Sequence, residues 1–131
     1  MPHVTTRIFI LSFATLAMLH ILSLRFYLYW RHEWLDIPMH LFGGSVVALG
    51  IFAAAELRIP CFRALTKTVP ALFTILTIAL VWEIYEYGIG ISVVNAEFIP
   101  DTALDLVMGM AGGVVGIYIA RKLSRLNADT L

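Results

Sequence analysis

Four long apolar runs constrain the fold of this chain more than any other feature of its sequence. They occupy residues 8–30, 37–56, 69–92 and 102–121. Each is close to the ~20 residues that a helix needs to cross ~30 Å of hydrocarbon. Backbone N–H and C=O groups cannot stay unpaired in lipid, so each run should be a helix. We therefore predict an all-α fold, a four-transmembrane-helix bundle in which residues 1–131 form a single integral membrane domain.

The composition supports this assignment and narrows the possible partners. The chain of 131 residues is 60% hydrophobic and only 14% charged, whereas a soluble domain is roughly 45–50% apolar and about 25% charged. Its formal net charge is zero, so overall charge gives no reason to expect a nucleic acid as a partner. The single cysteine, Cys61, excludes an intramolecular disulfide and a cysteine metal cluster, and we interpret it as an inert thiol in a loop.

The basic residues predict the orientation of the bundle. With four spans, both termini and the second loop, residues 56–68, share one side, and seven of the nine Lys and Arg residues fall there. Only Arg25 and Arg31 fall on the other side. Because positive residues concentrate on the cytoplasmic side, we predict cytoplasmic termini, with the short loops 31–36 and 93–100 facing outward.

The third run contains two carboxylates, within residues 81–88. An ionisable group inside a bilayer costs at least about 2.5 kcal/mol, so an intramembrane carboxylate is a candidate functional residue. At helical spacing, Glu83 and Glu86 lie on neighbouring turns of one face, and Tyr87 shares that face with Glu83. Trp82 and Tyr85 should face away from Glu83 and contact lipid or a neighbouring helix.

Two other predicted helices place polar residues at the same depth. Asp36 and His40 are four residues apart at the outer start of the second helix, and Asp101 and Asp105 have the same spacing in the fourth. At ~1.5 Å per residue, His40 and Asp105 lie about 6 Å below their partners, and Glu83 lies about 21 Å along the third helix. We therefore expect side chains from three helices to meet at one level near the outer surface.

Small residues accompany these polar groups. Gly43 and Gly44 follow His40 by one turn, and the fourth run contains Gly109, Gly112, Gly113 and Gly116. Small residues allow the backbones of membrane helices to approach closely, so these faces should point into the bundle. The same glycine-rich faces would also allow an oligomer to form.

Five carboxylates at one level need a counter-charge. A bound cation, shared protons, or pairing with Arg25, Arg31 or protonated His40 would each supply it. Inward-facing Glu, Asp and His side chains resemble the metal sites of helical bundles, and oxygen ligands with one imidazole suit a divalent Zn, Mn, Fe or Mg ion. The predicted metal ligands are His40, Glu83, Asp105, Asp36 and Glu86. The predicted catalytic residues are Glu83, Glu86 and Asp101, beside an ion that activates water or binds a phosphate.

Alternative interpretations remain for single residues. Asp36 and Asp101 start helices, where a carboxylate is also a good N-cap. For these two residues, we weigh an N-cap role equally with a role in the functional site. His20 is interpreted as a packing histidine with satisfied hydrogen bonds, with a ligand as the alternative. An aromatic group typical of a membrane–water interface lies at the end of the first run and just after it, and it consists of Tyr27, Tyr29, Trp30 and Trp34.

Three functions compete at this stage. The first is a metal-dependent hydrolase or transferase acting on a lipid or cell-envelope headgroup at the outer leaflet. The second is a cation- or proton-binding protein or transporter, although the apolar inner half of the predicted helices argues against a through-pathway. The third is a structural partner subunit whose cluster only fixes helix packing, and such a role would not need acids from three helices at one level.

The order of the motifs resembles two families of small membrane proteins, the VanZ-like and YjdF-like families. The resemblance covers roughly residues 36–116 and consists of Asp36-x-x-x-His40 with Gly43-Gly44, Trp82-Glu83-x-x-Glu86, and Asp101-Thr102-x-x-Asp105-Leu106 followed by Gly109 and Gly113. Glu86 stands where a Gln is often expected in the VanZ-like pattern, and Met108 where an Asn is usual, so the YjdF-like pattern fits better. The resemblance implies a multi-pass protein of the bacterial cytoplasmic membrane. It also implies a link to glycopeptide antibiotic resistance for VanZ-like members.

Overall fold

The computed structural model describes residues 4–90 and 98–128, and within these ranges it contains helices and turns but no strand. The elements are α1 (Val4–Arg25), α2 (Leu28–Arg31), a 3-10 helix η1 (Glu33–Leu35), α3 (Asp36–Glu56), α4 (Pro60–Leu65), α5 (Thr68–Ile89) and α6 (Phe98–Ala128). Four of the described helices are long and apolar enough to cross a membrane. The all-α, four-span prediction is therefore confirmed.

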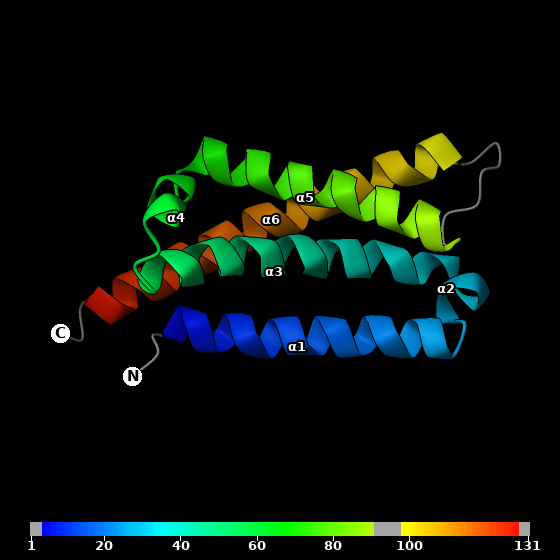
Figure 1. The fold of residues 1–131 in the computed structure, drawn as a ribbon, viewed down its shortest axis with the longest axis horizontal. Helices are drawn as coiled ribbons and strands as arrows, with labels where there is room; N and C mark the ends of the chain where they lie inside the picture. The colour runs from blue at the N-terminus through cyan, green and yellow to red at the C-terminus, as the bar shows by residue number, and fades with distance from the viewer. Residues whose placement is uncertain (1–3, 91–97, 129–131) are drawn as a thin grey trace.

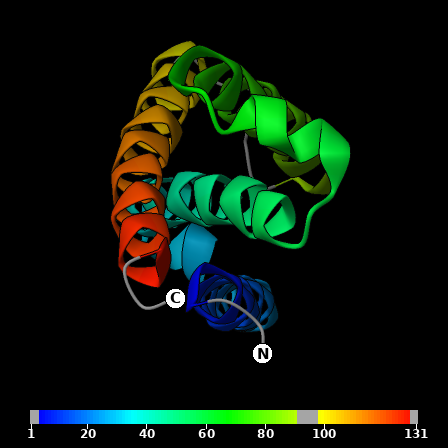
Figure 2. The same cartoon turned by 90° about the vertical axis from the view of Figure 1, so that its left-hand side faces the viewer.

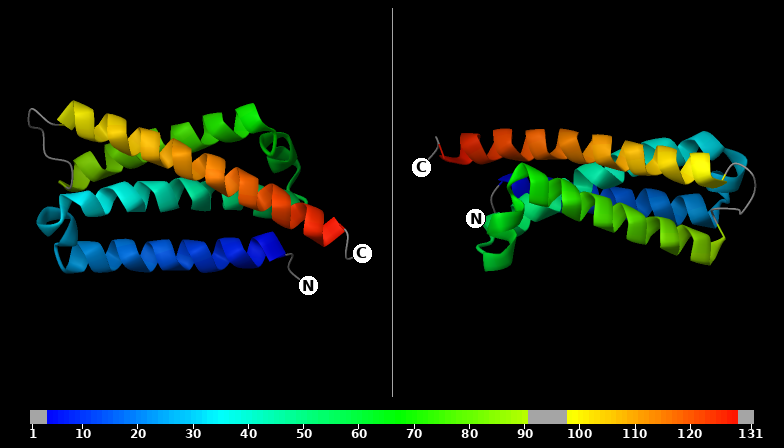
Figure 3. Two further views of the ribbon diagram at one scale, coloured as in Figure 1. Left: turned by 180° about the vertical axis from the view of Figure 1, so that it is seen from behind. Right: turned by 90° about the horizontal axis from the view of Figure 1, so that it is seen from above.

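The four long helices lie side by side, with α3 in the middle (Figure 1). Seen from the end, α1, α5 and α6 surround α3 (Figure 2), and α6 crosses α3 and α5 obliquely (Figure 3). The first residue of α1 and the last residues of α6 lie at the same end of the bundle as α4, whereas α2 lies at the other end (Figure 1). This places the ends of the described chain on one side, which we predict to be cytoplasmic.

The helix boundaries differ from the prediction in three of the four spans. The predicted helix 8–30 is in fact two helices, because Tyr27 adopts a left-handed conformation (φ 56°) between α1 and α2, which is unusual for a bulky residue. The third span ends at Ile89 rather than at residue 92, because Gly90 (φ 76°) forms its left-handed C-cap. The fourth span is longer than 102–121, and most of the predicted loop 93–100 lies outside the described residues.

Two smaller predictions also change. Cys61 is exposed, as an inert surface thiol should be, but it belongs to the short helix α4 and not to a loop. The interfacial aromatic group divides in two: Tyr29 turns inward and is only 5% exposed, whereas its three other members are exposed. The break at Tyr27 redirects the chain and allows this inward turn.

The half of the bundle next to the termini has an apolar core. Its buried members are Ala48, Leu49, Ile51, Phe52, Ala71, Ile75, Ile117 and Ala120. Polar contacts also join the helices at the end next to the termini. There the hydroxyl of Thr6 donates to Glu56 (3.1 Å), and Arg121 donates to the hydroxyl of Thr68 (2.9 Å).

Glycines bring α3 and α6 together, as their spacing predicted. A Cβ atom on Gly44 would collide with the backbone carbonyl of Gly109, and one on Gly112 would collide with the carbonyl of Leu41. The hydroxyl of Ser45 uses this close approach to donate to the carbonyl of Gly112 at 2.8 Å. These glycine faces are therefore occupied by contacts within the chain.

Gly44→Ala should destabilise the bundle, whereas Gly43→Ala should not. The added methyl group at position 44 meets backbone that cannot rotate away, but a Cβ at position 43 meets only Leu16, at 4.0 Å. Overpacking of this kind costs about 1–3 kcal/mol or more. Thermal unfolding in detergent would measure the difference, and equal midpoints for the two variants would contradict the described α3–α6 contact.

Candidate metal centre

The structure brings together five of the six side chains predicted for the site. Asp36 and His40 come from the first two turns of α3, Glu83 and Glu86 from the end of α5, and Asp105 from the outer part of α6. Four of them are buried, with exposed fractions of 6% for His40, 9% for Glu83, 1% for Glu86 and 2% for Asp105. We call these five residues the His40 cluster.

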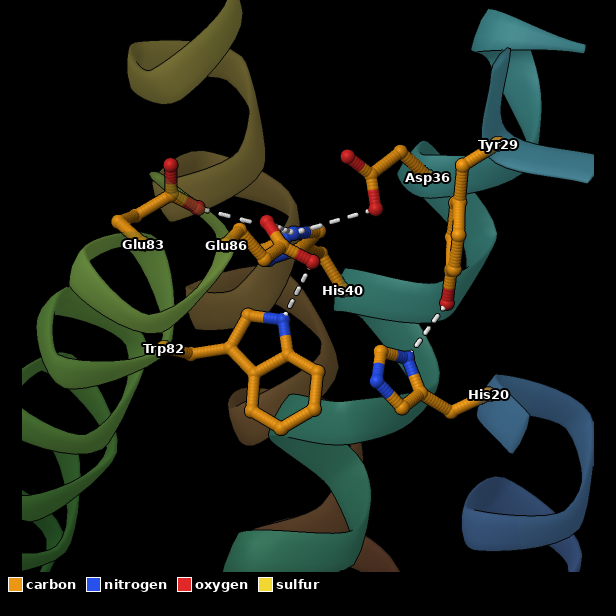
Figure 4. A network of polar contacts seen from close by, with 7 residues as sticks. All are labelled: His20, Tyr29, Asp36, His40, Trp82, Glu83 and Glu86. Atoms are coloured by element: carbon orange, nitrogen blue, oxygen red, sulfur yellow. Dashed lines mark hydrogen bonds and ion pairs between the residues drawn. The ribbon is translucent and has the colours of Figure 1, made fainter. Parts of the chain in front are cut away.

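The imidazole of His40 lies at the centre of the cluster (Figure 4). Its Nε2 atom is 3.5 Å from Asp36 Oδ1, 3.6 Å from Glu83 Oε1 and 3.5 Å from Glu86 Oε2. Hydrogen bonds of this type measure about 2.7–3.2 Å, so these three contacts are too long to be hydrogen bonds. The carboxylates therefore surround the ring nitrogen without binding it directly.

Each residue of the cluster has a buried polar atom with no hydrogen-bond partner among the described residues. These atoms are Asp36 Oδ1, His40 Nε2, Glu83 Oε1, Glu86 Oε2 and Asp105 Oδ1. Leaving one such atom unpaired costs about 1–3 kcal/mol, so five that face one another form an expensive arrangement. A cation bound within a set of three of these residues would satisfy the atoms of that set together.

The spacing of the donor atoms fits a metal ion. Metal–ligand bonds of about 2.0–2.2 Å in a tetrahedral site hold the ligand atoms about 3.3–3.6 Å apart, which agrees with the 3.5 and 3.6 Å separations around His40. Two groups of three residues could each hold an ion, because the ligand atoms within each group lie within 4.8 Å of one another. The first group is Asp36, His40 and Asp105, and the second is His40, Glu83 and Glu86. His40 is common to both groups.

Comparison with known proteins agrees with the membrane assignment. A family model described as "Predicted membrane protein (DUF2238)" matches residues 3–125. The chain belongs to this family. No curated protein and no solved structure matches it. The match does not connect this DUF2238 protein with the VanZ-like or YjdF-like families, so that resemblance remains a prediction.

Trp82 contributes to the cluster in this DUF2238 protein, which the sequence reasoning missed. Its indole N–H donates to Glu86 Oε1 at 2.7 Å, leaving Oε2 to face His40. The same ring contacts His20 of α1 edge-on, at 4.9 Å between ring centroids. The expected contact with a neighbouring helix is therefore present, but Trp82 does not simply face away from the site. In the sequence, the four-residue spacing between Trp82 and Glu86 could have indicated this hydrogen bond.

His20 has hydrogen-bond partners, as the packing interpretation predicted. Its Nδ1 atom is 2.9 Å from the hydroxyl of Tyr29, and its Nε2 atom is 3.5 Å from that of Tyr85. Burial, followed by the charges of Asp36 and Glu86, raises the pKa of Tyr29. Tyr29 therefore stays protonated and holds His20 beside the cluster.

The sixth predicted residue lies outside the cluster, and the N-cap alternatives need correction. Asp101 is exposed in the first turn of α6, one turn before Asp105, and belongs to neither candidate metal group. The N-cap of α3 is Leu35, so Asp36 is already helical and is not the cap. Asp101 is not a cap either, because α6 begins at Phe98. Both N-cap interpretations are wrong.

The predicted counter-charges from arginine are also absent in the described part of the chain. Arg25 and Arg31 are exposed, and neither forms an ion pair with the cluster among residues 4–90 and 98–128. Three remedies for the crowded carboxylates remain: a bound cation, shared protons, and pairing with a protonated His40, whose Nε2 atom lies within ion-pair distance of Asp36, Glu83 and Glu86.

Proposed function

We propose that this protein is a metal-dependent enzyme of the bacterial cytoplasmic membrane, a hydrolase or transferase acting on a lipid or cell-envelope headgroup at the outer leaflet. The observation that supports this proposal is the set of five buried donor atoms without partners that face one another around His40. The resemblance to VanZ-like and YjdF-like proteins supports the bacterial envelope as the setting.

The donor set restricts the choice of ion. Four carboxylates and one imidazole suit Zn, Mn, Fe or Mg. The 3.5–3.6 Å separations around His40 Nε2 are closer to a tetrahedral arrangement than to an octahedral one, and a tetrahedral arrangement favours zinc.

The cluster offers more donors than a catalytic metal needs. Catalytic zinc sites use three protein ligands and leave a position for water or substrate, and a bound ion would make such a water acidic. With five donors present, a carboxylate from α5 is left to accept the proton, the role we assign to Glu83 or Glu86. Asp101, exposed one turn nearer the outer end of α6, is placed to contact a headgroup.

The two competing functions fit the structure less well. A transporter needs polar groups through its full depth, but below the cluster the described helices meet in the apolar core around Leu49, Ile75 and Ile117. A polar network that only fixed packing would satisfy its own hydrogen bonds, whereas five buried atoms of the cluster have no hydrogen-bond partner among the described residues.

The purified wild-type protein should contain a divalent metal, and a chelator should lower its thermal stability. An ion that binds only the folded bundle stabilises it by about 2.7 kcal/mol at a concentration 100 times its Kd. Elemental analysis and thermal unfolding in detergent, with and without chelator and with metal added back, test both points. A metal-free protein whose unfolding ignores chelator would contradict the proposal.

Trp82→Phe should weaken metal binding without abolishing it. The substitution keeps an aromatic ring beside His20 but removes the 2.7 Å hydrogen bond that orients Glu86. Losing such an orienting partner typically costs about 10–100-fold in metal affinity. Titration of metal into the stripped protein measures this loss, with Trp34→Phe at an exposed position as the control. Equal affinities in the two variants would mean that the indole does not orient a ligand.

A further inference from the structure

A long apolar groove runs from the His40 cluster toward the inner half of the bundle. Its volume is about 540 Å³, and its walls come mainly from α1, α3 and α5. Helices α1 and α5 lie on different sides of α3 (Figure 2). Phe9, Phe13 and Leu16 form the α1 wall, and Ile78 and Ala79 lie opposite on α5. Nearly every other lining residue is also apolar or glycine.

The groove faces lipid and not water. All three helices that form most of its walls are long and apolar enough to span the membrane. Phe13 and Ile78 are 56% and 43% exposed, so its walls are open to the surroundings of the bundle. A ligand that enters from the bilayer would therefore meet these side chains first, and it must be apolar where it does so.

The outer end of the groove is continuous with the cluster. His40 and Trp82 line the groove. The same two side chains face the carboxylates, His40 through Nε2 and Trp82 through its bond to Glu86. One amphiphile can therefore place its apolar chain in the groove and its polar head at the cluster.

The length of the groove indicates which apolar chain it fits. On α1 the lining extends from Phe9 to His20, which is about 16 Å at ~1.5 Å per residue. The hydrocarbon core of a bilayer is about 30 Å thick and contains two acyl chains end to end, so one acyl chain spans about half of it. A groove of this length fits a single acyl chain, and a much longer polyprenyl chain would extend beyond it.

We propose that this groove binds one acyl chain of an outer-leaflet glycerophospholipid whose phosphate headgroup reaches the His40 cluster, making such lipids the substrate class. The inference rests on the proposed function, because a phosphate can approach four carboxylates only through a bound cation. The acyl chain supplies affinity by burial, and the cluster positions the headgroup for reaction.

Quenching of Trp82 fluorescence by brominated acyl chains tests this inference. The full-length, metal-loaded protein carries Trp30→Phe and Trp34→Phe, so that Trp82 is the remaining tryptophan. Phosphatidylglycerol with brominated chains, added in detergent, should quench it saturably, and the unbrominated lipid should reverse the quenching. Gly43→Leu should weaken the apparent affinity at least about tenfold, because its side chain enters the groove.

Gly88→Leu is the matched control. A Cβ at position 88 meets nothing within 4 Å, and Gly88 does not line the groove. The inference is supported if Gly43→Leu weakens the quenching while its metal content and helicity stay the same as in the wild type. Equal quenching in Gly43→Leu and Gly88→Leu, or reversal by polyprenyl phosphate but not by phospholipid, would overturn it.

Metal content measured on the same samples separates this inference from the proposed function. If the protein contains no metal but quenching is still saturable and is weakened by Gly43→Leu, the acyl-chain groove is supported and the metal-dependent enzyme is contradicted. Bound metal with non-saturable quenching would contradict the groove and leave the metal centre standing.

Discussion

His40→Ala should abolish metal binding while the four spans still form. The imidazole is the sole nitrogen donor of the cluster, and it belongs to both candidate metal groups. Because loss of a residue that merely orients a ligand costs about 10–100-fold in affinity, loss of this shared ligand should cost more than about 100-fold. Elemental analysis of the purified variant measures bound metal, and far-UV circular dichroism measures helicity.

His32→Ala is the control for this prediction. His32 is exposed in the short connection between α2 and η1, at the same end of the bundle, and lies outside both metal groups. It should retain the metal content of the wild type. A His40→Ala protein that still holds metal at the wild-type level would place the ion elsewhere or leave the carboxylates as its main ligands.

The number and class of the spans could be predicted because the bilayer imposes them. A helix that crosses lipid needs a long apolar run, and such runs are visible in the sequence. The break at Tyr27 was not visible, because the residues around it are as apolar and aromatic as those in the helix. A left-handed tyrosine depends on tertiary contacts, here the burial of Tyr29 against His20.

The cluster could be predicted in part, because depth follows from helical rise. Once orientation was inferred from the basic residues, counting along three helices placed His40, Glu83 and Asp105 at one level. Rotation of each helix about its axis was harder to infer. It decides that the indole of Trp82 reaches Glu86. Asp101 shares a helix face with Asp105 but lies one turn nearer the end of α6, where it is exposed.

The glycines show the same limit. Their spacing indicated a close approach between helices, but Gly43 and Gly44 looked equivalent in the sequence. The crossing of α3 over α6 makes Gly44 a backbone contact, whereas a Cβ on Gly43 would meet only Leu16 of α1. Which neighbour each glycine meets depends on the crossing geometry, and no local pattern specifies that.

Glu86→Gln should change stability in opposite directions with and without metal. With metal present, the variant loses a ligand and the charge that balances the ion, so its unfolding midpoint should fall below that of the wild type. With chelator, the wild type keeps four carboxylates around one imidazole, and removing one like charge relieves repulsion. The variant should then be more stable than the wild type.

The substitution suits this test because it changes charge and little else. Glu86 is only 1% exposed, and Gln keeps an oxygen that can accept the hydrogen bond from Trp82. Glu33→Gln removes a carboxylate at an exposed position in η1 and should leave both midpoints unchanged. Thermal unfolding of the three proteins, each with metal and with chelator, gives the four differences needed. If Glu86→Gln shifts the midpoint in the same direction under both conditions, the carboxylates do not face a cation, and a network of shared protons becomes the better account of the cluster.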